Sequence, residues 1–194
     1  MDLVLTDPPY GIGIADWDGA IPPPEYFSEI FRISKNQVIF GGNYFGLPHT
    51  EGWICWDKTY RYAQKWNIGE FELAWTSFDI KATFIRYTCC GNFRGMNEKV
   101  GADYSKKPNL HPTQKPDELF VKILKDYTSE DALVFDPFLG SGTTCVAAKM
   151  LGRSYIGIDI SDEYCQIARE RLRAVDTGVP VKEARAGQIG LFGG

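Results

Sequence analysis

An apolar run that opens into a glycine loop constrains the fold of this chain more than any other feature. The run is Ala132 to Phe135, and the loop after it contains Gly140 and Gly142 before a helical stretch. Glycine has no Cβ, so the backbone there can turn tightly and approach a ligand closely. A second apolar run, Tyr155 to Ile158, ends at Asp159. This order of strand, glycine loop, helix and acidic strand end predicts the nucleoside-binding unit of α/β proteins.

The glycine loop differs from a nucleotide-triphosphate P-loop in one decisive residue. A P-loop needs a Lys directly after its last Gly, and Thr143 stands there instead. Phosphate binding is therefore disfavoured. The Asp159 carboxylate, at the end of the second strand, is suited to accept hydrogen bonds from both hydroxyls of a ribose.

Strand-like and helix-like segments alternate along the chain, which predicts a Rossmann-like, doubly wound α/β fold. Its mostly parallel sheet would have helices on both faces, with ligands at the carboxyl ends of the strands. We expect a single domain over residues 1–194 with a flexible tail at 175–194. The expected strands are 3–6, 37–40, 53–57, 71–78, 133–135 and 155–158, with an extension or hairpin arm at 83–89. The expected helices are 24–34, 117–127, 143–151 and 161–174.

A short acidic and aromatic motif, Asp7-Pro8-Pro9-Tyr10, directly follows the first expected strand. Proline has no N–H and a fixed φ, so the carbonyls around Pro8 stay in place as acceptors. Asp7 and the Pro8 carbonyl would suit the two N–H groups of a planar amine, and the Tyr10 ring would cover the face of a base. By composition alone, an ordinary proline-rich turn is the better explanation of the motif.

Composition points to a compact enzyme without a membrane segment. The chain has 194 residues, of which 44% are hydrophobic and 24% are charged, and this is enough for one full-sized core. Its apolar runs are only strand-length, and no signal peptide precedes Asp7. The five cysteines form no C-x-x-C pair, so we expect reduced thiols in a cytoplasmic protein and no metal site.

Four motifs in one order give the chain its resemblance to a known family. They are Asp7 to Tyr10, His111 to Pro116, Asp136 to Thr144 with its glycines, and Gly157 to Asp159. The sequence resembles the S-adenosylmethionine-dependent DNA amino-methyltransferases, in the group where D-P-P-Y precedes the glycine motif. The resemblance covers nearly the whole chain. It implies a class I methyltransferase-like fold with a circularly permuted motif order.

The resemblance also implies which residues surround the cofactor S-adenosylmethionine, whose product is S-adenosylhomocysteine. The glycine loop and the strand end before it would line the methionine and ribose, and Asp159 would bind the ribose hydroxyls. Considered alone, the His111 motif is only a proline-bounded helix start, but its match places two residues near the cofactor carboxylate. The implied cofactor residues are Asp136, Pro137, Phe138, Gly140, Ser141, Gly142, Thr143, Asp159, Thr113 and Lys115. The implied catalytic residues are Asp7, Pro8, Pro9 and Tyr10.

The identity of the methylated base follows from single positions in the motifs. Within the family, Asp in the first position of D-P-P-Y goes mostly with adenine N6, whereas Ser there goes more often with cytosine N4. Asp7 therefore favours adenine, and cytosine N4 stays as the alternative. Methylation at cytosine carbon 5 needs a Cys after a Pro, and Phe138 follows Pro137 here. The target amine is inaccessible inside a duplex, so the base would flip out and stack on Tyr10.

Double-stranded DNA as the partner requires local cationic patches, because the net charge of the chain is −4. Segment 58–66 alternates cations with aromatic rings, and segment 81–107 holds six cations. We expect the target-recognition loop at 91–109, although ordinary solvated surface explains any single charge equally well. The candidate DNA contacts are Lys58, Arg61, Lys65, Arg94, Lys106 and Lys107.

Two further expectations concern the ends of the chain. Relatives usually carry a leader with a short acidic motif that lines the cofactor adenine, and here Met1 stands almost against the first strand. A minimal methyltransferase and a truncated, catalytically silent binding protein are both compatible with this start. Near the other end, Gln188 to Phe192 looks like the peptide by which bacterial proteins dock in the sliding clamp, although a frayed terminus is the simpler reading. Many relatives form dimers, so a homodimer is a further expectation.

Overall fold

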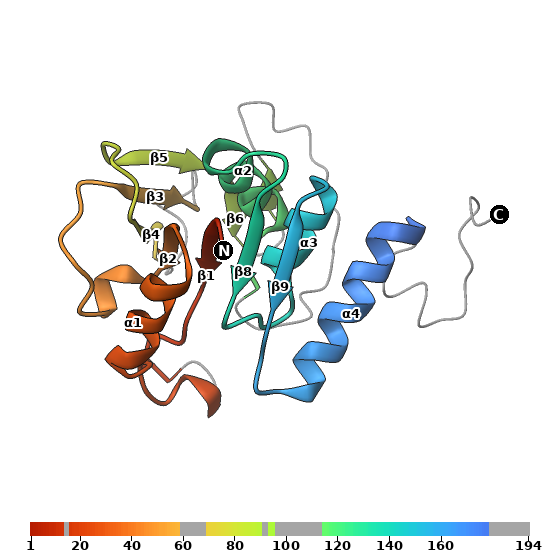
Figure 1. Cartoon of the computed structure of the whole chain (residues 1–194), viewed down its shortest axis with the longest axis horizontal. Coiled ribbons are helices and arrows are strands. Elements are labelled where there is room, and N and C mark those ends of the chain that lie inside the picture. The colour runs from red at the N-terminus through yellow and green to blue at the C-terminus, as the bar shows by residue number, and fades with distance from the viewer. Residues whose placement is uncertain (14–15, 59–68, 91–92, 96–113, 179–194) are drawn as a thin grey trace. The chain divides into compact units, whose positions relative to one another are not determined.

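The computed structural model of the chain describes residues 1–13, 16–58, 69–90, 93–95 and 114–178. Its residues divide into two compact units, drawn as one ribbon in Figure 1. The glycine-loop unit comprises residues 1–6 and 109–194, and the D-P-P-Y unit comprises residues 7–108. The single-domain expectation stays a prediction.

Three parallel strands form the sheet of the glycine-loop unit. They are β1 (Leu3–Thr6), β8 (Leu133–Asp136) and β9 (Ser154–Gly157), and β8 lies in the middle. Leu3 is opposite Val134 in the register, and both residues are fully buried. Unbroken apolar runs are typical of parallel strands that are covered on both faces. Because the three strands are parallel, their carboxyl ends meet at one edge.

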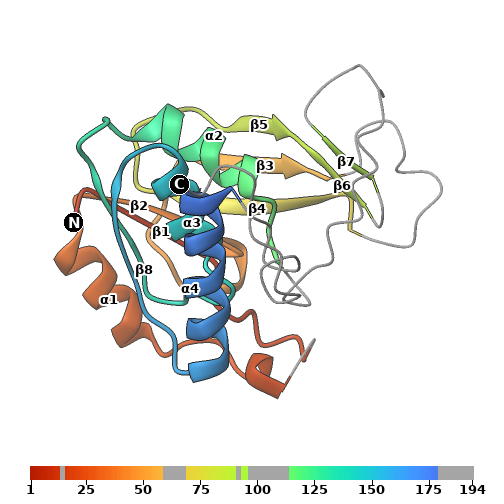
Figure 2. The ribbon, with the colours of Figure 1, turned by 90° about the vertical axis from the view of Figure 1, so that its right-hand side faces the viewer.

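Three helices complete the glycine-loop unit. They are α2 (Asp117–Tyr127), α3 (Thr143–Met150) and α4 (Asp162–Thr177). Helix α3 connects β8 to β9, packs on both strands, and also contacts α2 and α4. Figure 2 shows α4 nearest the viewer, with α3 next to it. The glycine loop thus lies between the end of β8 and the start of α3.

The D-P-P-Y unit contains a mixed sheet in the order β5-β3-β4-β2. The strands are β2 (Asn36–Phe40), β3 (Trp53–Asp57), β4 (Phe71–Thr76) and β5 (Thr83–Arg86). Strand β4 is antiparallel to β2 and β3, and β5 runs parallel to β3. Helix α1 (Pro24–Ile33) packs against β2 and has Pro at its first position.

Short elements complete this unit. The 3-10 helices are η1 (Asp16–Asp18) and η2 (Gly42–Tyr44), and η2 directly follows the end of β2. Strands β6 (Thr88–Cys90) and β7 (Phe93–Gly95) form an antiparallel pair. The expected arm at 83–89 is therefore two strands, β5 and the start of β6. The segment expected to be a loop at 91–109 contributes one strand, β7.

The predicted α/β fold with a mostly parallel sheet is confirmed. The pairings β1–β8, β8–β9 and β3–β5 are parallel, whereas those made by β4 and the β6–β7 pair are antiparallel. Some boundaries differ from the predictions: β4 ends at Thr76 rather than at residue 78, and α4 runs on to Thr177. No helix among the described residues has both the length and the apolar character needed to cross a membrane.

Candidate active site

Asp136 ends β8 and is buried, with 3% of its surface exposed. Its Oδ1 accepts hydrogen bonds from Thr6 Oγ1 at 2.6 Å and from the Phe138 N–H at 3.0 Å. Its Oδ2 accepts from Thr144 Oγ1, also at 2.6 Å. Each donor lies on a different element: β1, the glycine loop and α3. The carboxylate thus fixes the base of the loop from within, and neither threonine was among the predicted site residues.

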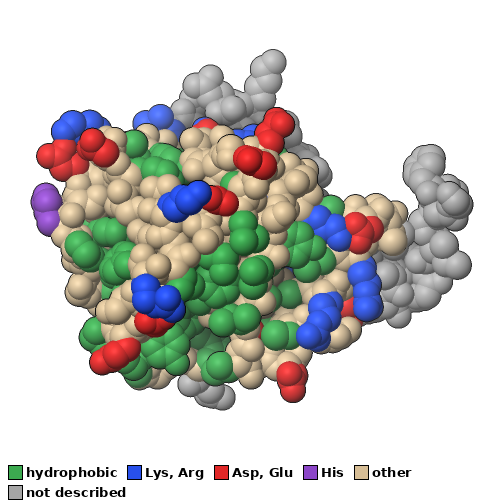
Figure 3. All heavy atoms as spheres, viewed as in Figure 1, with side chains coloured by type: hydrophobic (Ala, Val, Ile, Leu, Met, Phe, Trp, Pro, Cys, Tyr) green, Lys and Arg blue, Asp and Glu red, His purple; other side chains and the backbone are tan. Residues whose placement is uncertain are grey.

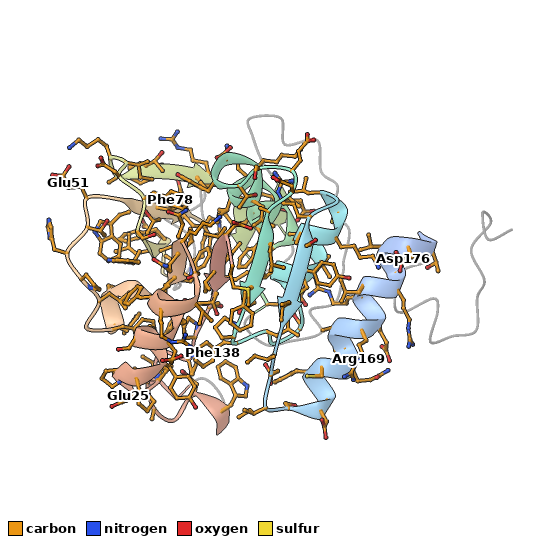
Figure 4. The ribbon with its side chains drawn as sticks, in the orientation of Figure 1. Glu25, Glu51, Phe78, Phe138, Arg169 and Asp176 are labelled. Atoms are coloured by element: carbon orange, nitrogen blue, oxygen red, sulfur yellow. The ribbon has the colours of Figure 1, made fainter. Side chains whose placement is uncertain are left out.

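The glycine loop needs its two glycines for different reasons. Both have positive φ, 51° at Gly140 and 87° at Gly142, and other residues rarely adopt this conformation. A Cβ on Gly142 would also stand 2.7 Å from the Cβ of Ala168 on α4. The Leu139 N–H donates to the Ile158 carbonyl at 2.9 Å, which ties the loop to the segment after β9. Figure 4 labels Phe138 in the same loop.

Asp159 follows β9 and holds the loop from the other side. Its Oδ2 accepts the Gly140 N–H and its Oδ1 accepts the Ser161 N–H, both at 2.8 Å. A carboxylate has about four acceptor sites, so these two bonds leave capacity for two hydroxyl donors. The neighbouring side chain of Ile160 is fully exposed. A carboxylate beside an apolar surface is the combination that a nucleoside requires.

The part of the His111 motif that the structure describes contacts the glycine loop. Lys115 is buried, with 7% exposure, and its carbonyl accepts a hydrogen bond from Thr143 Oγ1 at 3.4 Å. The structure thus brings Lys115 and Thr143 together. Thr113 lies outside the described residues.

Asp7 and Tyr10 form a hydrogen-bonded pair in the D-P-P-Y unit. The Tyr10 hydroxyl donates to Asp7 Oδ1 at 2.5 Å. Burial raises the pKa of Tyr10 far above its ordinary range, and the negative charges of Asp7 and Glu72 raise it further. Tyr10 is therefore a neutral donor to Asp7 at physiological pH.

Three neighbours fix the ring of Tyr10. Tyr44 of η2 stacks on it with ring centroids 4.9 Å apart and an interplanar angle of 11°, and Phe45 meets it edge-on. A Cβ on Gly41 would stand 2.2 Å from Cε1 of Tyr10, so only glycine fits there. The buried Asp18 holds the turn after Tyr10 by accepting the Gly11 N–H at 2.8 Å. The sequence reasoning identified Tyr10 but none of these supports.

The candidate DNA contacts are only partly within the described residues. Lys58 forms an ion pair with Glu72, with Nζ 2.9 Å from Oε1, and its ammonium group lies 5.8 Å from the centroid of the Trp56 ring. The remaining candidates, or their side chains, lie outside the described residues: Arg61, Lys65, Arg94, Lys106 and Lys107. On the face drawn in Figure 3, the Lys and Arg side chains of each unit are interspersed with acidic ones.

The described residues contain no group of three or more His, Cys, Asp or Glu side chains that could hold a metal ion.

One charged residue that prediction missed is Arg171, which is buried among the loop residues. Its spacing in the sequence could have indicated that it is buried. It follows Ile167 by four and Ala168 by three, so it falls on the apolar face of α4, where a charge is unusual.

The structure thus has a glycine loop between β8 and α3, an acidic residue after β9 and a D-P-P-Y turn after β1, the motifs on which the chain resembles the S-adenosylmethionine-dependent DNA amino-methyltransferases. The sequence profile of the family N6_N4_Mtase, DNA methylase, matches residues 49–170, which is more than half of the chain. The chain belongs to this family of DNA methylases.

Relatives and solved structures agree with this assignment. The type II methyltransferase M.HpaI of Haemophilus parainfluenzae is 31% identical over an alignment of 216 positions, which covers 89% of this chain and 68% of that protein. The crystal structure of the M1.HpyAVI–SAM complex is 25% identical with a TM-score of 0.53, and the match covers 88% of each chain. The cytosine-N4-specific PvuII DNA methyltransferase has the same fold, with a TM-score of 0.57 at 17% identity, over 96% of this chain and 83% of that one.

Proposed function

We propose that this chain transfers a methyl group from S-adenosylmethionine to the exocyclic N6 amine of adenine in a specific DNA sequence. The observation that carries the proposal is the Asp7–Tyr10 pair, in which a neutral phenol orients the carboxylate through a 2.5 Å hydrogen bond. An aspartate in the first position of D-P-P-Y favours adenine over cytosine by the resemblance described above.

The residues of the glycine-loop unit fit S-adenosylmethionine. Asp159 has acceptor capacity for the two ribose hydroxyls, and the exposed Ile160 offers an apolar face to the adenine ring. The loop from Gly140 to Thr143 would surround the methionine part, with Lys115 near its carboxylate. When bound, S-adenosylmethionine supplies an electrophilic methyl group on a sulfonium. Asp136 acts by holding the loop, because both of its oxygens already accept hydrogen bonds from protein groups.

Asp7 would activate the target amine by accepting one of its N–H groups, while the Pro8 carbonyl accepts the other. The lone pair of a nucleobase amine is delocalised into the ring, and these two bonds would localise it on nitrogen. A carboxylate has about four acceptor sites, so Asp7 can bind the amine while Tyr10 stays bound. No covalent enzyme intermediate is needed, and alignment of the reactants can supply on the order of 7–11 kcal/mol. Asp7 would also stabilise positive charge that develops on the amine.

The stack of Tyr44 on Tyr10 sets a condition on base binding. Two rings whose centroids are 4.9 Å apart have no room for a base between them. A base that flips out of the duplex must therefore displace Tyr44 or use another part of the Tyr10 surface. Tyr44 is 45% exposed, so its ring can leave at modest cost in buried area.

Double-stranded DNA is the proposed partner, held by local cationic segments rather than by the net charge. Lys58 would contribute only if a phosphate competes with Glu72 for its ammonium group. A homodimer, a cytoplasmic location and docking of Gln188 to Phe192 in a sliding clamp stay predictions; those tail residues lie outside the described part of the chain.

Mass spectrometry of nucleosides tests the proposal. DNA is incubated with the protein and S-adenosylmethionine that carries a deuterated methyl group, and is then digested. We expect labelled N6-methyladenine as the product. Labelled 4-methylcytosine alone would mean that the chain methylates the N4 amine of cytosine, by the chemistry proposed here for an exocyclic amine. Label on carbon 5 of cytosine, or no label in DNA, would contradict the proposed role of Asp7.

A further inference from the structure

Arg171 makes three hydrogen bonds to the glycine loop. It lies on α4 with 7% of its surface exposed. Its Nη1 donates to the Ser141 carbonyl at 2.7 Å, to Ser141 Oγ at 3.1 Å and to Thr143 Oγ1 at 3.3 Å. Its Nη2 forms an ion pair with Asp117, the first residue of α2. One guanidinium group therefore binds the loop and the start of a second helix together.

The partners of Arg171 belong to the two segments proposed to surround the cofactor. Ser141 and Thr143 are in the glycine loop, and Asp117 is two residues after Lys115. The Thr143 hydroxyl accepts from Arg171 and donates to the Lys115 carbonyl, so it links the same two segments a second time. Arginine suits this position because its planar fork presents several donors in fixed directions, whereas a lysine offers one compact ammonium group.

Stability of the fold alone does not explain the contacts of Arg171. Burying the Arg171 guanidinium costs solvation, and replacing a buried charge and its partner by apolar residues of similar volume is often neutral or stabilising. Its partner Asp117 keeps 29% of its side chain exposed. The Arg171 site lies on the apolar face of α4, beside Ile167 and Ala168, where an aliphatic side chain would pack without that cost. Arg171 instead fixes the relative position of two binding segments, and binding groups must be held to within about 0.5 Å.

We propose that Arg171 is a positioning residue that sets the affinity of this chain for S-adenosylmethionine, by locking the glycine loop to the Lys115 segment. The inference rests on the proposed function, because it takes the loop as the cofactor site. Arg171 acts through Ser141, Thr143 and Asp117 and does not itself touch the cofactor.

The test is titration calorimetry of the full chain with S-adenosylhomocysteine, which binds without turnover. The variant Arg171→Lys keeps the charge and loses the fork, and we expect its Kd to rise at least about tenfold with an unchanged stoichiometry. Steady-state kinetics should show the same rise in KM for S-adenosylmethionine, with kcat at saturation within about threefold of the original value. Asp117→Asn is nearly isosteric and should raise the Kd in the same direction by a smaller factor.

A matched control uses another ion pair of α4. Lys149 on α3 pairs with Asp176 at 2.6 Å without touching the loop, and Figure 4 labels Asp176 near the end of α4. Lys149→Gln should leave the Kd unchanged. The inference is overturned if Arg171→Lys lowers the stoichiometry at an unchanged Kd, which indicates a role in folding only. Should Arg171→Lys fail to fold, an unchanged Kd in Asp117→Asn overturns it equally. If the unsubstituted chain does not bind S-adenosylhomocysteine, the proposed cofactor site fails first, and the inference fails with it.

Discussion

The chemistry of Asp7 depends on residues that hold the Tyr10 ring as much as on Asp7 itself. The carboxylate receives the Tyr10 hydroxyl, and the ring that carries this hydroxyl rests on Tyr44 and against Gly41. The D-P-P-Y motif predicted Asp7 and Tyr10. Nothing in the sequence around Gly41 indicated its role, because a Gly-Gly pair after a strand is ordinary turn chemistry.

Gly41→Ala tests this packing. Its φ of 66° is strained for alanine, and the added Cβ would overlap the Tyr10 ring. We expect a loss of about 2–4 kcal/mol in the free energy of unfolding, from both effects together, and a lower kcat. The matched control is Gly152→Ala, with a φ of 70° and nothing within 4 Å of the new Cβ. It should lose only about 1 kcal/mol and keep its kcat. Equal losses in urea denaturation would show that the ring contact contributes nothing.

At the scale of elements, α4 is the helix on which the loop depends. It begins at Asp162, directly after the N-cap Ser161, and ends at Thr177, before Gly178, whose left-handed conformation stops the helix. Between these ends it supplies Ala168, which packs against Gly142, and Arg171, which binds the loop. The position of the cofactor loop therefore depends on the integrity of this helix.

Ser161→Ala tests the start of α4. The Ser161 hydroxyl accepts the Tyr164 N–H at 3.3 Å, so the substitution leaves that backbone donor without its cap. We expect a loss of about 1 kcal/mol in the free energy of unfolding, measured by denaturant titration. Ser28→Ala in α1 is the control, because the exposed Ser28 hydroxyl donates to the Pro24 carbonyl within the helix and caps no backbone N–H. Its change should stay within about 0.5 kcal/mol. An equal loss in the two variants would argue against the cap.

Where the sequence has clear start and stop signals for an element, the predicted bounds match the observed ones. Helix α2 matches at both ends because Pro116 precedes it and its apolar residues recur at helical spacing. Strand β7 was missed because Phe93–Gly95 is short and lies among glycines, where no alternation can be read. The helical pattern of α4 was predicted to stop at Ala174, although Gly178 marks the observed end. The buried cation Arg171 was missed because its partners come from two distant segments.

At the scale of the whole molecule, the two units carry different halves of the proposed reaction. The glycine-loop unit holds the groups that fit the cofactor, and the D-P-P-Y unit holds the carboxylate for the amine. One of their two junctions in the sequence lies between Thr6, which binds Asp136, and Asp7. The motif order predicted the two roles, D-P-P-Y for the amine and the glycine loop for the cofactor, but not a division of the chain into two units. The DNA contacts could not be assigned in the same way, since surface charges carry no comparable pattern.

Methylation-sensitive sequencing of DNA treated with the chain tests the central claim most directly, because it reports activity, base and site together. The comparison is DNA treated with Asp7→Ala, a variant that should still bind S-adenosylhomocysteine in the calorimeter. We predict modified adenines at one recurring short sequence with the unsubstituted chain, and none with Asp7→Ala. Modified adenines at the same sites with Asp7→Ala, or unmodified DNA with the unsubstituted chain, would contradict the account.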